Sequence, residues 1–233
     1  MRCRFVVTMM VLAAAMTGTS AASGQTARKS QPAGGSQATR ASVNPNKAKL
    51  LTPSQLNEKG PDVFQAKFDS SKGVFVIEVH RDWAPIGADR FYNLVKNGFF
   101  DGCRFFRVIP DFMVQFGING DPAVDAAWER ADIKDDPVKQ SNKLGYISYG
   151  NTGRPNSRGT QVFINYKDNS FLDTQRFSPF GQVLSGMDVV VKLNSEYGSK
   201  PQEAQGTIKT EGNKFLISKF PKLDYIKRVT IEK

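Results

Sequence analysis

Short apolar runs separated by polar turns recur along most of the chain, and they predict β-strands. Residues 63–68 and 74–79 alternate between apolar and polar side chains, and Lys72 and Gly73 between them suit a turn. Further short apolar runs predict strands over 104–109, 112–116, 146–150, 161–164, 180–183 and 224–231. We therefore expect a fold built mainly from short strands.

Helical spacing occurs in three places. Apolar residues between 88 and 95 fall on one face of a helix, for which Pro85 suits the first turn and Gly98 suits the end. Residues 187–193 predict a second helix. The tail between residues 208 and 216 also places apolar residues at helical spacing.

The polar stretch over residues 118–145 has no regular period, and we expect a long loop there. Asp135 and Asp136 lie in this stretch, and we expect both carboxylates to be solvated. Many short strands with few helices are typical of an antiparallel barrel. The predicted fold class is mainly β, a closed antiparallel β-barrel with two flanking helices and a C-terminal extension.

The composition supports one sizeable core. The chain has 233 residues, of which 39% are hydrophobic and 17 are Phe. This length allows one domain with tails or two small domains. Two Cys exclude a disulfide-stapled miniprotein, and a single His, His80, leaves no His-rich metal site.

The N-terminus has the pattern of a targeting segment. Arg2 and Arg4 precede an apolar run, and small residues follow up to Ser20 and Ala22. This pattern predicts a secretory signal peptide over residues 1–22, cleaved near Ala22, which makes the protein exported, either periplasmic or secreted. A retained membrane anchor is the alternative, but the run of about 12 residues is short for a span. Cleavage leaves Cys103 as the one thiol, and we expect it to be buried.

A basic, low-complexity stretch follows. The formal net charge of the whole chain is +10, and most of the excess lies before residue 60. From Ser23 to about Lys49 the chain lacks aromatic and acidic residues and is rich in Ser, Ala, Gly, Gln and Pro, and we predict a flexible basic linker over residues 23–60. The linker is either a plain spacer or a weak attachment to an anionic cell surface. Because the remaining chain is nearly balanced in charge, we do not expect nucleic-acid binding.

Most familiar catalytic motifs are missing, including a nucleophile elbow, a phosphate loop and HExxH. Three other segments stand out: FFRVIPDFMVQFG (105–117), GNTGRPNSRGTQVFIN (150–165) and SFLDTQRFSPFGQV (170–183). In them the chain resembles the cyclophilins, the peptidyl-prolyl cis/trans isomerases. The resemblance covers residues 61–195 as the isomerase domain. The tail over 196–233 resembles the C-terminal extension of an exported bacterial subgroup, ending in a strand that completes the barrel.

The resemblance implies a role for individual residues. Arg107 stands at the position of the family's catalytic arginine. Substrate-binding positions match Phe112, Met113, Gln115, Gly150, Asn151, Gln161, Phe163, Phe171, Leu172 and Phe177. The chain departs from the family pattern where Phe106 and Phe177 replace His and Phe171 replaces Trp. No cofactor and no metal are implied.

The chemistry needs few groups. Rotation about an X–Pro bond has to pass a barrier of about 18–20 kcal/mol, because the amide has partial double-bond character. A fixed guanidinium such as that of Arg107 is able to donate a hydrogen bond to the prolyl nitrogen in the twisted state.

The expected function is isomerisation of X–Pro bonds in unfolded or partly folded exported proteins. The alternative is a non-catalytic proline-peptide-binding or holdase chaperone module. We expect a monomer without a stable membrane span.

Overall fold

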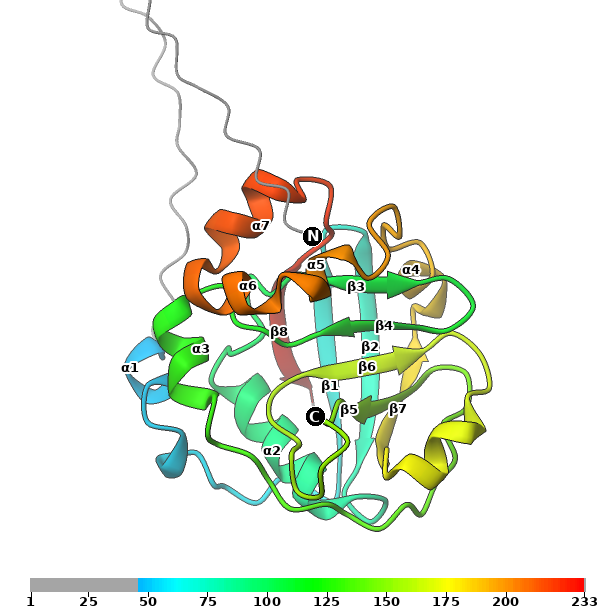
Figure 1. Ribbon diagram of the computed structural model, residues 1–233. Coiled ribbons are helices and arrows are strands. Elements are labelled where there is room, and N and C mark those ends of the chain that lie inside the picture. The colour runs from blue at the N-terminus through cyan, green and yellow to red at the C-terminus, as the bar shows by residue number, and fades with distance from the viewer. Residues whose placement is uncertain (1–45, 233) are drawn as a thin grey trace, which may run out of the picture. The chain divides into compact units, whose positions relative to one another are not determined.

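A single antiparallel sheet of 8 strands curls around the hydrophobic core, in the order β3-β4-β6-β5-β7-β2-β1-β8 (Figure 1). In this computed structural model, residues 46–232 are described. The strands are β1 (Val63–Ser70), β2 (Gly73–His80), β3 (Arg107–Ile109), β4 (Met113–Phe116), β5 (Tyr146–Tyr149), β6 (Val162–Asn165), β7 (Pro179–Ser185) and β8 (Ile226–Glu232). The predicted mainly β, antiparallel fold is confirmed. The predicted signal peptide and residues 23–45 of the predicted linker lie outside the described residues.

The two edges of the sheet meet without forming a ladder. Strand β8 pairs with β1, and β3 is the strand at the other edge. The chain just before β3 reaches β8 through a bridge between Arg104 and Tyr225. Next to it, Phe105 N donates to Asp224 O at 3.0 Å and Ile226 N donates to Cys103 O at 2.9 Å. The barrel is therefore joined by a few hydrogen bonds along this seam.

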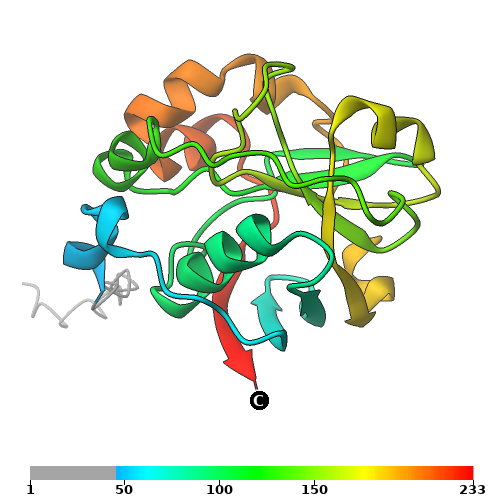
Figure 2. The ribbon, with the colours of Figure 1, turned by 90° about the horizontal axis from the view of Figure 1, so that it is seen from below.

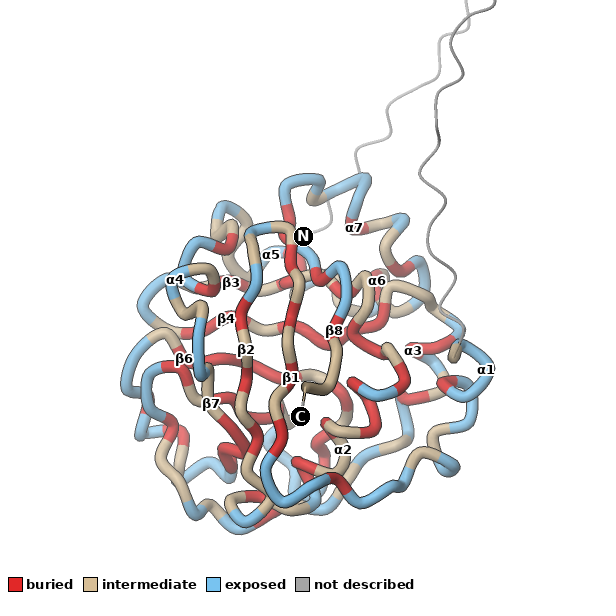
Figure 3. The backbone as a smooth tube through the Cα atoms, turned by 180° about the vertical axis from the view of Figure 1, so that it is seen from behind, coloured by how far each residue is buried: buried red, intermediate tan, exposed pale blue. Residues whose placement is uncertain are grey.

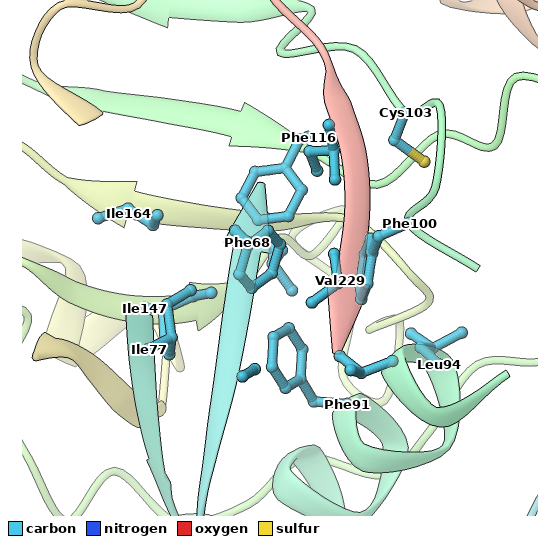
Figure 4. Close-up of a cluster of buried hydrophobic side chains, with 14 of the residues drawn as sticks. Phe68, Ile77, Phe91, Leu94, Phe100, Cys103, Phe116, Ile147, Ile164 and Val229 are labelled. Carbon is cyan, nitrogen blue, oxygen red and sulfur yellow. The ribbon is translucent and has the colours of Figure 1, made fainter. Parts of the chain in front are cut away.

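Strand pleating places alternate side chains in the core. Along β1 and β2 buried residues alternate with less buried ones, as Figure 3 shows. The interior is rich in phenylalanine, and the rings of Phe68 and Phe116 lie 5.8 Å apart, centroid to centroid. Phe91 and Phe100 extend this cluster (Figure 4). These contacts bury the apolar area that stabilises the fold.

The helix α2 (Pro85–Lys96) lies across one end of the barrel (Figure 2). It begins at Pro85 as predicted, and Gly98 follows it with a φ of 70°. Asp136 holds its first turn, because its carboxylate accepts from Ile86 N at 3.0 Å and from Gly87 N at 2.9 Å. Asp136 is 4% exposed, so the prediction of a solvated carboxylate is wrong for this residue.

The stretch predicted as a long loop, residues 118–145, contains a helix, α3 (Pro122–Trp128). The Asp121 side chain caps it by accepting from Ala123 N at 3.0 Å. Val124 and Trp128 are buried beneath the helix. The prediction failed here because a helix of two turns buries too few apolar residues to show a period.

The end of the predicted flexible linker is ordered on the domain, which corrects that prediction for residues 46–60. Here the chain forms α1 (Lys47–Leu50) and a 3₁₀ turn, η1 (Pro53–Gln55). Leu50 is 1% exposed, and its carbonyl accepts from Trp128 Nε1 at 2.8 Å. One buried leucine in a polar stretch gives little sequence signal.

Between α4 (Met187–Val190) and β8 the chain forms three short helices, α5 (Lys200–Glu203), α6 (Gln205–Glu211) and α7 (Asn213–Lys219). We call residues 194–223 the α5–α7 insertion; Figure 1 shows its helices gathered at the β3 edge of the sheet. It has a small core of its own, built around Phe106 and Ile118 of the barrel and Ile208, Leu216 and Leu223 of the insertion.

Candidate active site

The predicted site residues converge on one cavity of about 130 Å³, and only Gln161 and Phe171 do not line it. The cavity lies over strands β4 and β6, which pair with Gln115 opposite Phe163. Its lining consists of Arg107, Phe112, Met113, Gln115, Gly150, Asn151, Phe163, Leu172, Phe177 and Gln202.

Alternation along β4 separates this cavity from the barrel core. Val114 and Phe116 belong to the main core, whereas Met113 belongs to a smaller cluster with Phe163 and Leu172. Phe177 closes one side, with its ring 5.5 Å from that of Phe163 at an angle of 79°. The cavity therefore has an apolar floor of a size that suits one small ring.

Polar groups form the opposite side of the cavity. The Arg107 guanidinium donates from Nη1 to Gln115 Oε1 at 3.2 Å and from Nε to Ser199 Oγ at 3.2 Å. Gln115 Nε2 in turn donates to Gln161 Oε1 at 2.9 Å. Both oxygens that hold Arg107 are uncharged, so its positive charge is not neutralised by these contacts. Burial lowers the pKa of Arg107 from its usual value, but a guanidinium stays protonated in proteins.

The two predicted residues that do not line the cavity lie next to it. Gln161 stands behind Gln115, whose amide it accepts from. Phe171 is 55% exposed, and its ring stacks on that of Phe112 at 6.2 Å. The structure thus places Gln161 as a support of the polar side and Phe171 at the rim, on the 3₁₀ turn η2 (Ser170–Gln175).

A larger, more polar cavity of about 760 Å³ continues from the first. The two share Gln115, Gly150, Asn151 and Gln202. Helices α3 and α6 form the far walls of the larger cavity. An ion pair between Lys209 and Glu129 spans these walls with an N–O distance of 3.5 Å. Together the two cavities form a continuous groove.

Sequence reasoning missed two residues of the site. Ser199 and Gln202 both come from the α5–α7 insertion, and Ser199 contacts Arg107 across 92 positions of the chain. No sequence motif surrounds them, so no signal could have found them. The insertion also gives a reason for Phe106, which stands where the family pattern has a His. The core of the insertion covers this side chain, which is 1% exposed.

Cys103 and His80 do not line the cavity. Cys103 is fully buried, as expected, and burial raises the pKa of its thiol well above the usual value. The His80 ring stacks on that of Trp83 with a centroid distance of 4.2 Å, and its Nε2 lies 2.9 Å from Glu78 Oε1.

Over residues 46–232 no three His, Cys, Asp or Glu side chains are grouped to hold a metal ion. In the same range no helix is long and apolar enough to span a bilayer.

Solved structures share this fold. A cyclophilin type peptidyl-prolyl cis-trans isomerase of Cryptosporidium parvum aligns with a TM-score of 0.55 at 17% identity, over 73% of this chain and 98% of that chain. That protein was also crystallised in the presence of the dipeptide Ala-Pro. Cyclophilin AquaCyp293 from Hirschia baltica aligns with a TM-score of 0.53 at 19% identity, over 74% of each chain.

Sequence comparison points to the same family. A peptidyl-prolyl cis-trans isomerase of Acinetobacter baylyi is 38% identical over 135 residues, which cover 54% of this chain and 71% of the relative. Peptidyl-prolyl cis-trans isomerase-like 1 of Rhizopus delemar is 34% identical over 159 residues, which cover 65% of this chain and 86% of the relative. The family model of the cyclophilin type peptidyl-prolyl cis-trans isomerases matches residues 64–212, and the chain belongs to that family.

Proposed function

We propose that this peptidyl-prolyl cis-trans isomerase acts through Arg107, with the proline ring of the substrate in the cavity of Met113, Phe163 and Leu172. The observation that carries the proposal is the Arg107 guanidinium, held by two uncharged oxygens on the polar side of an apolar cavity. Such a group offers a fixed positive charge to a ligand in that cavity. Among residues 46–232, Arg107 is the only charged side chain that lines this cavity.

The catalytic step is a rotation, so no covalent bond is made or broken. In the planar amide the prolyl nitrogen is a poor acceptor, since its lone pair is conjugated with the carbonyl. In the twisted state the lone pair is localised, and a donor from Arg107 stabilises that state more than either planar state. The apolar floor holds the ring while Gln115 and the backbone near Gly150 and Asn151 hold the peptide frame. Exclusion of water in the cavity strengthens the contact with the guanidinium.

The test is an isomerisation assay on an Ala-Pro peptide. Replacing Arg107 by Ala removes the fixed donor, and we expect kcat/KM to fall about 10²- to 10³-fold, as for other preorganised donors. Arg228, an exposed arginine of β8, provides the matched control, and Arg228→Ala should keep wild-type activity. A folded Arg107→Ala variant within a few-fold of wild type would show that the catalytic role is assigned to the wrong residue.

The proposed clients are unfolded or partly folded proteins that leave the cytoplasm. The support is the N-terminal pattern of a secretory signal, with a cleavage site near Ala22. Catalysis in the compartment where exported chains fold would shorten the slow X–Pro isomerisation of those chains. Expression of the full chain, followed by mass measurement of the exported protein, tests this. A product that begins near residue 23 is expected, and a full-length product retained inside the cell contradicts the proposal.

A further inference from the structure

The α5–α7 insertion covers the edge of the strand that carries Arg107. Val108 N of β3 donates to Gly198 O of the insertion at 3.4 Å. Ser199 follows directly, and Figure 1 shows α5 beside β3. The segment thus lies along the backbone of the strand immediately behind the guanidinium.

The Ser199 hydroxyl is directed at Arg107 and not at its own helix. Ser199 occupies the N-cap position of α5, where a serine side chain ordinarily accepts from the first turn. Here it makes no capping hydrogen bond, and its Oγ accepts from Arg107 Nε at 3.2 Å. The Ser199 hydroxyl therefore forms a hydrogen bond with Arg107 and does not cap helix α5.

The position of Ser199 is fixed by packing. Gly198 adopts a φ of 54°, which turns the chain toward the strand. Tyr197 packs its ring against that of Phe220 at 5.2 Å, on the core of the insertion. Phe106, the residue before Arg107, lies in that same core. One cluster therefore holds both partners of the Ser199–Arg107 contact.

We propose that Ser199 is a positioning residue for catalysis, which fixes the plane of the Arg107 guanidinium through Nε and leaves the charge free for the substrate. This inference rests on the proposed role of Arg107. Without Ser199, the guanidinium would keep one hydrogen bond, to Gln115, and the contact with the Phe112 ring at 5.9 Å, and the Nε side of the group would have no acceptor to fix its direction. A hydroxyl suits the second acceptor better than a carboxylate, since an uncharged oxygen orients the group without pairing with its charge.

Kinetics provide the first test, on the same Ala-Pro peptide and with the full chain. Ser199→Ala should lower the rate on bound peptide about tenfold, the size of a coupling within one hydrogen-bond network, while peptide affinity changes less than about threefold. Ser199→Thr keeps a hydroxyl and should recover most of the rate. Ser195→Ala, which changes another half-buried serine of the same turn, should match wild type.

An NMR measurement distinguishes an effect of Ser199 on the Arg107 guanidinium from an effect on the stability of the surrounding fold. The Nε–H resonance of Arg107, identified by its loss in Arg107→Lys, should shift in Ser199→Ala and return toward its wild-type position in Ser199→Thr. An unchanged resonance, or a rate in Ser199→Ala equal to that of wild type beside an impaired Arg107→Ala, would overturn the inference and leave the role of Arg107 intact. An active Arg107→Ala would refute the proposed function instead.

Discussion

Two arginines show how differently this chain uses one type of side chain. Arg158 is 1% exposed, and its Nη2 lies 2.9 Å from the carboxylate of Asp136, so its charge is neutralised inside the protein. Arg107 is half-buried; its hydrogen bonds go to the uncharged oxygens of Gln115 and Ser199, and its guanidinium lies 5.9 Å from the centroid of the Phe112 ring. The first arrangement fixes the carboxylate that holds the first turn of α2, and the second leaves a positive charge at the wall of the cavity.

Removal of one member of the buried Arg158–Asp136 pair is expected to lower the stability of the fold strongly. Arg158→Ala leaves the buried Asp136 carboxylate with its backbone hydrogen bonds but without its positive partner, and we expect the free energy of unfolding to fall by about 3–5 kcal/mol. Arg176, an exposed arginine 3.7 Å from Asp135, is the control, and Arg176→Ala should cost less than about 1 kcal/mol. Urea denaturation of both variants measures the difference. Equal costs for the two would mean that the buried pair does not hold this region.

The same residue inventory predicts a weak pH dependence of catalysis. Arg107, Gln115 and Ser199 form the polar network, and none of them changes charge near neutrality. Cys103 lies in the barrel core, where burial raises its pKa, so its thiol stays neutral as the pH rises through this range. We expect kcat/KM on a peptide without titrating groups to be flat between about pH 6 and 8. A bell-shaped profile in that range would reveal a titrating group in the site.

At the scale of elements, the insertion behaves as a small layer added to the barrel edge. Its core is separate from the main core and reaches the barrel at Phe106 and Ile118. Elements with a small core of their own open locally before the whole domain unfolds. We therefore expect the insertion to open locally at a lower free energy than the barrel.

Two neighbours on α7 test this separation. Leu216 is 3% exposed in the insertion core, whereas Ile217 is 53% exposed. Leu216→Ala should destabilise by about 2–5 kcal/mol and speed amide hydrogen exchange in the insertion more than in β1 and β2. Ile217→Ala should leave exchange nearly unchanged. Uniformly faster exchange over the whole domain in Leu216→Ala would show that the insertion and the barrel open as one unit.

The elements that could be predicted from the sequence are those with a clear local pattern of apolar and polar residues. The strands β1 and β2 alternate cleanly and α2 has both a Pro start and a Gly end, so their pattern was sufficient. Helix α3 and the packing of Leu50 rest on a few buried residues in polar surroundings, and no period reveals them. The cavity residues that belong to ordered motifs came together as expected. Ser199 joined them only through a tertiary contact, which no local pattern encodes.

For the whole molecule, the barrel core and the cavity are built from opposite faces of the same strands. On β6, Val162 and Ile164 belong to the main core and Phe163 to the cavity. A change at the cavity therefore removes little of the packing that stabilises the fold. This separation is the reason to expect a folded protein when Arg107 is replaced.

The central claim is that Arg107 stabilises the twisted state of the peptide more than it stabilises the bound planar states. Exchange NMR on an Ala-Pro peptide measures both the affinity and the cis/trans exchange rate on the protein. For Arg107→Ala we expect affinity within about threefold of wild type and an exchange rate of the bound peptide about 10²-fold or more below it. A variant that loses affinity in proportion to activity, with an unchanged rate for the peptide that still binds, would contradict the claim.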